Sequence, residues 1–466
     1  MFTELHLKQF KSWRDTLPVA LAPITVFFGA NSSGKTSLLQ SLLLQKQTTE
    51  SPDRKRVLDL GSPGSLVDVG TYQDIVFNHE RQADLYMSVS WRQSQPLQVL
   101  DPLERARKKS AIVMSSRDLR FEATLTVAKN NAIVSAMQYQ VGGGTVGLRQ
   151  AAKPHDYELT ASAYKFVRTQ GRPWPLPAPA KFYGFPDQVR LYYQNASFVS
   201  DLELSLEDAY STIRYLGPMR EDPRRQYIYS GGAPSDVGHR GELAVEALIA
   251  ARQQDRRSSR GWQGKERHRK SRAIPLESLV AEWLKQLGLI DSFELEAIDD
   301  RQTLYRVYVR KTQQSARVLL TDVGFGVSQV LPVLVLLAYA NEGDTVILEQ
   351  PEIHLHPAVQ SALADVIIEA ALARRVQVIV ESHSEHFLLR IQRRVAEHAL
   401  DRGLVLDVDD VSLYFCEVRG EESRLVRLEM DLFGNILNWP ADFFGDPIGD
   451  SVAVVEARAR REAEFK

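Results

Sequence analysis

A glycine-rich stretch near the N-terminus has the residue types and the spacing of a phosphate-binding loop. Residues 29–36, Gly-Ala-Asn-Ser-Ser-Gly-Lys-Thr, fit the pattern G-x-x-x-x-G-K-[ST]. They lie between an apolar β-rich run, Ile24–Phe28, and a run that predicts a helix from Ser37. Glycines let backbone N–H groups close around phosphate oxygens, and a helix N-terminus adds partial positive charge. A chance match in a turn is disfavoured because the strand and the helix are both present.

The same motif predicts a role for its side chains. We expect Lys35 to reach the β- and γ-phosphates of ATP and the Thr36 hydroxyl to ligate Mg²⁺. ATP and Mg²⁺ are therefore the predicted cofactors. The predicted phosphate-binding residues are Gly29, Ala30, Asn31, Ser32, Ser33, Gly34, Lys35, Thr36 and Ser37.

Two further groups of candidate residues follow apolar strands in the C-terminal third. The first strand, Thr345–Glu349, ends in a carboxylate that can hold Mg²⁺ through water, and Gln350 and Glu352 follow it. An acid just past such a strand can orient the water that attacks a phosphate. The second strand precedes His383, whose ring can donate a hydrogen bond to a γ-phosphate. A lone histidine would more often be structural, but three strand-end motifs in this order favour Gln350, Glu352 and His383 as catalytic residues.

Composition limits the classes of protein that this chain can represent. A 466-residue chain predicts two or three domains, and its net charge of −2 excludes a nucleic-acid binder that is basic throughout. The single cysteine, Cys416, excludes an internal disulfide and a cysteine-based zinc site, which fits the cytoplasm. The N-terminus lacks the features of a secretion signal, and the longest apolar run, Val330–Ala340, is too short to span a bilayer. We therefore expect no membrane association.

The elements that must position these residues alternate between strand and helix. This alternation in the C-terminal third predicts a parallel sheet, whereas residues 80–210 show short β-like runs with frequent breaks. We expect an N-terminal ATPase part in 1–80, an inserted arm for partner binding in 81–300, a C-terminal ATPase part in 301–400 and a tail in 401–466. Within the arm, residues 252–272 contain nine Lys/Arg and two Asp/Glu, which predicts a mobile basic loop. Contact with nucleic acid and simple solvation are equally good interpretations of this loop.

Taken together, these stretches resemble the ABC-type ATPases of the SMC, RecF and OLD group. The loop at 29–36 resembles Walker A, Leu348–Glu352 resembles Walker B with the D-loop after it, and Ser382-His383 resembles the switch-histidine loop. Leu320–Gln329 lies where the group carries its signature motif. The resemblance implies that Gly324, Gly326 and Ser328 contact the γ-phosphate bound by the opposite subunit. It also makes Gln73 the candidate Q-loop glutamine at the metal, with Gln47 as the weaker candidate.

Three segments resemble one bacterial family of such ATPases without an assigned function. They are residues 349–357, 215–220 and 431–444. The broader group includes ATPase subunits of antiphage systems such as Septu and PARIS. The resemblance implies an α/β fold with a mixed or parallel sheet, a β-rich inserted arm and an α/β C-terminal tail. It also implies an ATP-sandwiched homodimer or higher oligomer that acts as a sensor or switch for a partner effector, such as a nuclease.

Two other functions compete with this switch. A RecF-like DNA-binding ATPase in DNA repair or processing is the main alternative. A transporter subunit is disfavoured, because the signature is atypical and Lys35 and Glu349 are 349 − 35 = 314 residues apart.

Two departures from the group bear on activity. Gln350 replaces the usual glutamate, which favours slow hydrolysis over the modest turnover that a water-orienting glutamine gives. The signature also lacks Leu-Ser-Gly-Gly, which weakens the expected contact with the opposite ATP.

Other acidic and histidine residues have less specific interpretations. Glu352, His354 and His356 could be metal ligands, but the D-loop region of a dimer interface is the favoured interpretation. Asp407 and Asp409 resemble the acidic pair of a Toprim nuclease, which OLD proteins carry after their ATPase. Here the pair precedes the strand at 411–415 instead of ending one. We therefore expect no Toprim domain.

Overall fold

The structure is a computed structural model of the chain. It describes residues 1–80, 83–100, 112–128, 131–153, 155–171, 174–259, 273–399, 406–440, 443, 452–458 and 461. The α/β class predicted from the sequence is confirmed, because parallel strands alternate with helices around a mixed sheet. Among the described residues, no helix is both long enough and apolar enough to cross a membrane.

A six-stranded sheet forms the centre of the molecule. Its order is β10-β17-β18-β4-β19-β20; the first five strands are parallel and β20 runs antiparallel to β19. The strands are β10 (Ile213–Leu216), β17 (Thr345–Glu349), β18 (Gln377–Glu381), β4 (Ile24–Gly29), β19 (Val411–Arg419) and β20 (Glu422–Arg427). The carboxyl ends of the five parallel strands therefore meet at one edge, where open α/β sheets bind their ligands.

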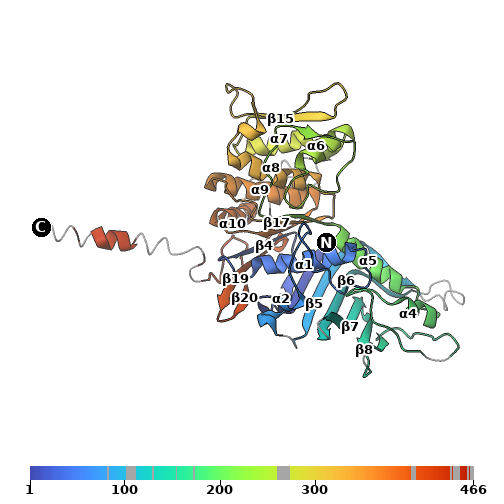
Figure 1. The fold of residues 1–466 in the computed structure, drawn as a ribbon. Coiled ribbons are helices and arrows are strands. Elements are labelled where there is room, and N and C mark those ends of the chain that lie inside the picture. Colours follow the sequence, from blue (N-terminus) through green and yellow to red (C-terminus); the bar gives the residue numbers. More distant parts are fainter. Residues whose placement is uncertain are drawn as a thin grey trace.

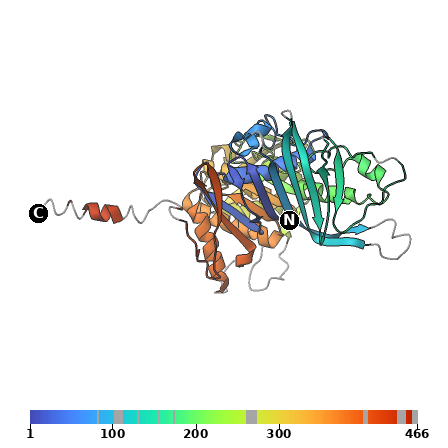
Figure 2. The same cartoon turned by 90° about the horizontal axis from the view of Figure 1, so that it is seen from below.

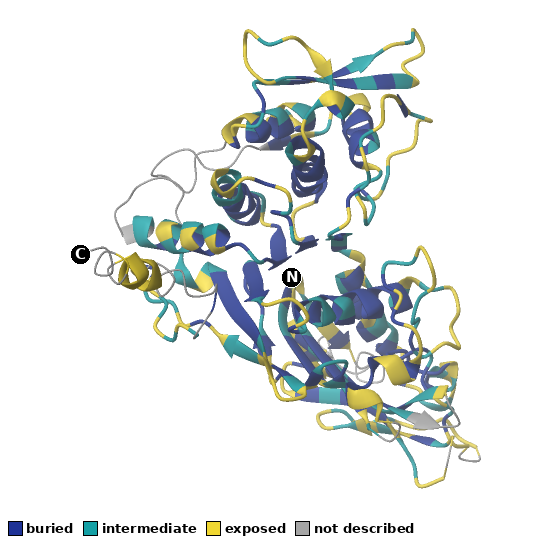
Figure 3. Ribbon diagram, turned by 60° about the vertical axis from the view of Figure 1, so that its left-hand side comes forward, coloured by how far each residue is buried: buried dark blue, intermediate teal, exposed yellow. Residues whose placement is uncertain are grey.

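Strands β17, β18 and β4 of this sheet are buried on both faces, which explains their continuous apolar sequences. In β17, Val346 and Leu348 face one core, whereas Ile347 faces the other. Figure 1 shows helices α8, α9 and α10 on one side of the sheet and α1 with α5 on the other. Figure 3 shows buried strands in dark blue between these helical layers. The helices are α1 (Lys35–Glu50), α2 (Tyr72–Ile75), α4 (Asp187–Tyr192), α5 (Val199–Ser211), α6 (Ala244–Gln253), α7 (Leu276–Gln286), α8 (Phe325–Tyr339), α9 (Pro357–Arg374) and α10 (Glu385–Ala399).

An eight-stranded antiparallel sheet joins the N-terminus to the predicted arm. Its order is β2-β1-β5-β6-β7-β8-β9, and β3 also pairs with β1. The strands are β1 (Phe2–Phe10), β2 (Trp13–Asp15), β3 (Val19–Ala20), β5 (Leu85–Leu100), β6 (Ile112–Ala128), β7 (Asn131–Val141), β8 (Gly144–Gln150) and β9 (Tyr157–Ala161). Figure 2 shows the blue N-terminal strands between the teal strands of the arm and the orange and red strands of the central sheet.

Smaller elements complete the molecule. A four-stranded sheet packs near α6, α7 and α8, and a two-stranded sheet pairs β12 with β13. The strands are β11 (Tyr227–Ile228), β14 (Ser292–Ala297), β15 (Leu304–Arg310), β16 (Val318–Leu319), β12 (Arg257–Ser259) and β13 (Ala273–Pro275). The 3-10 helices are η1 (Phe77–His79), η2 (Leu320–Asp322) and η3 (Val408–Asp410).

The structure differs from the predicted division of the chain in three places. Strand β10 pairs with β17, so part of the predicted arm lies inside the central sheet. Strand β19 pairs with β4, so residues 411–419 complete this sheet instead of forming a tail. Two parallel strands that pair in a sheet lie far apart in the chain, so no local sequence pattern indicates which strands pair. Within the predicted basic loop, residues 252–259 end α6 and form β12, and Arg252 pairs with Glu277. Residues 260–272 lie outside the described residues.

Candidate nucleotide-binding site

The loop at residues 29–34 joins β4 to α1 and has two tightly constrained glycines. Gly29 has φ +139°, and a Cβ at this position would lie 2.2 Å from the Cys416 carbonyl oxygen on β19. Gly34 has φ +93°, precedes the first residue of α1 and accepts a hydrogen bond from Trp13 Nε1 at 3.1 Å. Only glycine fits such an approach and such dihedral angles. Residues 30–32 are exposed, so the outer face of the loop is open to solvent.

Lys35 and Thr36 begin α1 at the inner side of this loop. Lys35 Nζ donates to the carbonyl oxygens of Gly29 at 3.0 Å and Ala30 at 2.7 Å. Burial lowers the pKa of Lys35, and the nearby carboxylates of Glu381 and Glu352 oppose this shift. The Thr36 hydroxyl donates to Glu381 Oε2 at 2.8 Å. The Lys35 ammonium group is therefore hydrogen-bonded to backbone carbonyls of its own loop. Both this ammonium group and the Thr36 hydroxyl lie beside Glu381 at the end of β18.

Two carboxylates lie side by side where β17 and β18 end. Glu349 and Glu381 are register partners on these parallel strands, and both are buried. Burial raises the pKa of Glu349 to about 7, and the charge of Glu381 adds to this rise. Burial also raises the pKa of Glu381, although Thr36 and Lys35 oppose it. Tyr215 OH, at the end of β10, donates to Glu349 Oε1 at 2.8 Å.

Gln350 and Glu352 occupy the turn that follows β17. Gln350 has φ +44°, and its backbone N–H donates to the Glu381 carbonyl oxygen at 2.8 Å. A bulky residue at such a φ is strained, and such strain gathers at functional sites. Glu352 Oε1 accepts hydrogen bonds from Ser382 Oγ and from the His383 backbone N–H, both at 2.7 Å. Its buried Oε2 has no hydrogen-bond partner among the described residues.

His383 follows β18 and is half-buried. Burial lowers the pKa of His383, the charge of Lys35 lowers it further, and a hydrogen bond with the Gly29 backbone opposes both. The ring is therefore neutral at pH 7, and a neutral imidazole can donate one hydrogen bond. The predicted catalytic residues thus lie on two adjacent turns, and their catalytic roles stay predictions.

The two histidines after Glu352 have structural neighbours. His356 is the N-cap of α9, and its Nδ1 accepts from the Ala358 backbone N–H at 3.3 Å. His354 is exposed and lies edge-on to the Phe325 ring at 6.1 Å between ring centroids. No group of three His, Cys, Asp or Glu side chains suited to a metal ion occurs in the described part of the chain.

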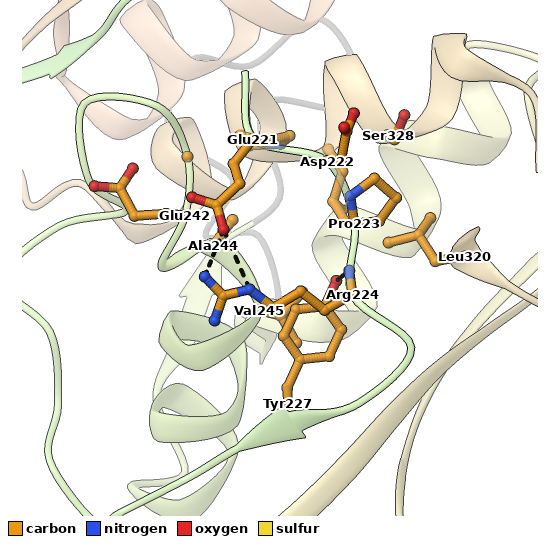
Figure 4. A pocket seen from close by; sticks show the side chains of 13 residues that line it. Glu221, Asp222, Pro223, Arg224, Tyr227, Glu242, Ala244, Val245, Leu320 and Ser328 are labelled. Atoms are coloured by element: carbon orange, nitrogen blue, oxygen red, sulfur yellow. Dashed lines mark hydrogen bonds and ion pairs between the residues drawn. The ribbon is translucent and has the colours of Figure 1, made fainter. Parts of the chain in front are cut away.

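The predicted signature residues lie at the start of α8. Gly324 is the exposed N-cap, Gly326 lies in the first turn, and Ser328 Oγ donates to the Phe325 carbonyl oxygen at 2.9 Å. Ser328 also lines a pocket of about 30 Å³ with Glu221 and Arg224, which Figure 4 shows from close by. The exposed Gly324 leaves the start of α8 accessible to another molecule. Their contact with the ATP of an opposite subunit stays a prediction.

The two glutamines predicted for the Q-loop contact other parts of the chain. Gln73 is exposed on α2, and its Nε2 donates to the His79 carbonyl oxygen at 3.5 Å. Gln47 is buried in α1, where its amide contacts Asp59 and Val67. The described contacts join neither glutamine to Thr36 or Glu349, so the role of Gln73 at the metal stays a prediction.

Three residues that the sequence interpretation did not assign belong to this edge: Tyr215, Arg220 and Glu381. Glu381 ends an apolar strand just as Glu349 does, and this signal was available in the sequence. Tyr215 and Arg220 lie at the end of β10 and just after it. Arg220 Nη2 donates to the Glu349 carbonyl oxygen at 3.1 Å. Their place beside β17 depends on strand pairing that no local pattern reveals.

The chemistry of these residues fits ATP with Mg²⁺. Magnesium prefers oxygen ligands from hydroxyls and carboxylates, and it usually keeps several waters. Thr36, Glu349 and Glu381 are such ligands beside a glycine-constrained loop. The unpaired Glu352 Oε2 adds a buried acceptor next to them. A nucleotide phosphate on the loop would therefore meet Lys35 and a metal held by Thr36 and Glu349.

Comparison with known families adds two matches. Residues 211–390 match the model of an AAA domain described as a putative AbiEii toxin of a type IV toxin–antitoxin system. Residues 406–451 match the model of a protein family of unknown function, DUF3696. No curated protein matches the chain. The AAA match begins at the last residue of α5, just before β10, and ends in α10, and β4 brings the phosphate-binding loop into the same sheet.

Matching solved structures include three SMC heads. One is an SMC head bound to the C-winged helix domain of ScpA, with 10% identity, a TM-score of 0.46, and coverage of 92% of this chain and 98% of that chain. Another is the SMC head domain from Thermotoga maritima, with 10% identity, a TM-score of 0.40, and coverage of 92% and 99%. The third is the Pyrococcus furiosus SMC head with an extended coiled coil, bound to the C-terminal domain of ScpA. It has 10% identity, a TM-score of 0.43, and coverage of 92% and 96%.

Proposed function

With an ABC-type P-loop ATPase domain as the starting point, we propose that this protein binds ATP with Mg²⁺ and hydrolyses it slowly. The observation that carries the proposal is the convergence of polar and charged side chains at one edge of the central sheet. Lys35 and Thr36 come from α1, Glu349 comes from β17, and Glu352 and His383 come from the turns after β17 and β18. Each group has the chemistry that one part of a nucleoside triphosphate requires.

Each side chain then has a defined task. Lys35 exchanges its two carbonyl partners for phosphate oxygens, because a phosphate is the stronger acceptor for an ammonium group. Thr36 and Glu349 would hold Mg²⁺, whose charge would offset the charge on the transferred phosphate. His383 exchanges the Gly29 carbonyl, the present partner of its ring N–H, for the terminal phosphate. The pKa of His383 is lowered by burial, so the ring gives this hydrogen bond as a neutral donor.

The residue at position 350 sets the rate. Gln350 can orient a water molecule through its amide but cannot accept a proton at pH 7. Glu352 is the next acid after Gln350 in the chain. Its Oε1 accepts hydrogen bonds from Ser382 and the His383 backbone, which leaves the buried Oε2 as the free acceptor. Proton transfer therefore depends on one buried oxygen of a carboxylate two residues beyond position 350, and we expect ATP to be retained for long periods.

We further propose that two copies enclose ATP and that the closed state controls a separate effector in antiphage defence. The exposed start of α8 offers Gly324 and its N–H groups to a second copy. The description of the matching AAA family as a toxin of a toxin–antitoxin system supports a role in a defence pair. The effector would respond to the assembly that ATP maintains.

Binding of a fluorescent ATP analogue to the full chain tests the site. Lys35→Ala should abolish Mg²⁺-dependent binding. Lys46→Ala is the matched control, because Lys46 is also buried in α1 but pairs with Glu50 at the far end of the helix. Unchanged affinity in a folded Lys35→Ala protein would rule out this site.

Light scattering with and without ATP tests the assembly. The wild type should form a larger species with ATP, and Gly324→Arg should prevent it without loss of nucleotide binding. Co-purification of an effector from the native cell only when ATP is present would support the switch. Co-purification of DNA instead would favour a DNA-processing ATPase.

A further inference from the structure

Arg220 is a buried cation whose hydrogen-bonding capacity is only partly used. It lies in the β10 loop, which we define as residues 217–226, and its exposed fraction is 7%. Nη2 donates to the Glu349 carbonyl oxygen at 3.1 Å. Nε and Nη1 have no hydrogen-bond partner among the described residues. Burying an arginine with two unpaired donors is unfavourable, and such a group usually serves a ligand.

The position of Arg220 connects it with the nucleotide-binding edge. Strand β10 pairs with β17 in register up to Leu216 and Leu348, so the β10 loop begins beside Glu349. Burial lowers the pKa of Arg220 to about 10, and nearby Tyr215, Glu349 and Glu352 oppose this shift. Arg220 therefore keeps its positive charge at pH 7.

Lys35 and Arg220 both lie close enough to Glu352 to be affected by its charge. Glu352 raises the pKa of Arg220 and also that of Lys35, in both cases against the larger effect of burial. Glu352 Oε2 is itself buried without a partner. Two cations and one unpaired acceptor therefore surround the region where the P-loop, β17 and β10 end.

The β10 loop is anchored at points other than Arg220. The Glu221 backbone N–H donates to the Arg240 carbonyl oxygen at 2.9 Å, and Arg225 Nη2 lies 2.9 Å from Asp322 Oδ1 just before α8. Within the loop, Arg224 pairs with Glu221, as Figure 4 shows. The single hydrogen bond from Arg220 to the Glu349 carbonyl could be made by a lysine. The unpaired Nε and Nη1 leave further N–H donors for phosphate oxygens while Nη2 stays on the Glu349 carbonyl, which the single nitrogen of a lysine does not.

We propose that Arg220 donates an unpaired guanidinium N–H group to the terminal phosphate of ATP, so that the site distinguishes ATP from ADP. This inference rests on the proposed function of the site. The terminal phosphate is the one expected at Arg220, because the same strand end carries Gln350 and Glu352, which face the attacked phosphorus. Lys35 at the P-loop contacts the β-phosphate as well, so its contribution is shared by both nucleotides.

The test compares the affinities of the full chain for fluorescent analogues of ATP and ADP, both with Mg²⁺. Arg220→Lys should weaken ATP binding by about 10- to 100-fold, as expected for losing a charge-assisted hydrogen bond. It should change ADP binding by less than about threefold. Arg220→Ala should do the same or more. Thermal melting of each variant shows whether it is folded. If Arg220→Ala is unfolded, the affinities of Arg220→Lys alone decide the test.

Arg374→Lys is the matched control. Arg374 ends α9, at the opposite edge of the sheet, and burial lowers its pKa to about 10 as well. It also has one unpaired buried nitrogen, Nη1. This variant should leave both affinities unchanged.

The outcomes separate the two proposals. If folded Arg220→Lys binds ATP and ADP each with the wild-type affinity, the role of Arg220 is overturned. A proportional loss of both affinities would also overturn it, because Arg220 would then only support Glu349. If Lys35→Ala retains both affinities, the site itself is misplaced and the proposed function fails.

Discussion

The carboxyl edge of the six-stranded sheet and the interior of the eight-stranded sheet bury opposite kinds of side chain. At the edge, five charged residues are less than 10% exposed: Lys35, Arg220, Glu349, Glu352 and Glu381. In the eight-stranded sheet the buried residues are mainly aromatic and aliphatic, such as Trp91, Phe121 and Tyr139. Its charged pairs, such as Arg92 with Asp118, lie at the surface.

The difference shows where the molecule gains stability and where it gains function. Buried aromatic rings stabilise the fold through the hydrophobic effect and through favourable ring contacts. Phe121 lies 4.8 Å from Tyr139 and 5.6 Å from Phe182 between ring centroids. Buried charges cost free energy unless they are fully paired. The pKa of Glu349 is raised to about 7 because burial penalises its charged form. The edge is therefore prepared for a charged ligand at the expense of stability.

Changing Gln350 to glutamate should have the largest effect and should act on function alone. The variant gains a group that can accept a proton, so phosphate release should accelerate by about 10²- to 10⁴-fold. The ATP-dependent assembly should become shorter-lived, which light scattering after dilution would measure. If the wild type already turns over as fast as the glutamate variant, another group is the catalytic base and ATP is not retained.

Truncating Phe121 should have the opposite profile. Phe121→Ala should lower the free energy of unfolding by about 3–5 kcal/mol, because it leaves a cavity among packed rings. Affinity for the ATP analogue should not change under conditions in which the variant is folded. Urea unfolding and analogue titration of one preparation measure both quantities. A folded variant with reduced affinity would show that the two regions are not independent.

Glu349→Gln should make the protein more stable at high pH. The folded-state pKa of this acid, about 7, exceeds its ordinary value of 4.5. The wild type therefore loses stability as the pH rises from about 4.5 to 7, whereas glutamine does not titrate. The difference in the free energy of unfolding between Glu349→Gln and the wild type should reach at most about 3 kcal/mol at pH 8 and decrease toward pH 5. Melting temperatures at both pH values measure it, and equal differences would contradict the buried-charge account.

The smallest effect is expected at an exposed pair of the eight-stranded sheet. Arg92 Nε and Nη2 donate to Asp118 at 2.6 and 3.2 Å, but both side chains are more than half exposed. Arg92→Ala should change the free energy of unfolding by less than about 1 kcal/mol, because solvent and salt screen such pairs. Urea unfolding in low and high salt tests this. A loss as large as that of Phe121→Ala would mean that surface charges contribute to this sheet as much as its core.

Local sequence predicted the parts of the site that are contiguous in the chain. The loop at 29–36 and the strand ends at Glu349 and His383 each combine a short strand with a polar turn, and that combination is legible without a structure. The fold class followed from strand–helix alternation for the same reason. The arm sheet was recognised as β-rich, but its union with β1 was not.

The tertiary structure decided what surrounds these motifs. Strands β10 and β19 enter the central sheet from positions that lie far from their neighbours in the chain, and parallel pairing leaves no mark in either sequence alone. Only that pairing brings Tyr215 and Arg220 against Glu349. Likewise, only the packing of β18 beside β4 places Glu381 on the Thr36 hydroxyl. The sequence by itself determined that the chain has a phosphate-binding loop and acidic strand ends. Burial and strand order, which are properties of the whole fold, decided which other charges share their site.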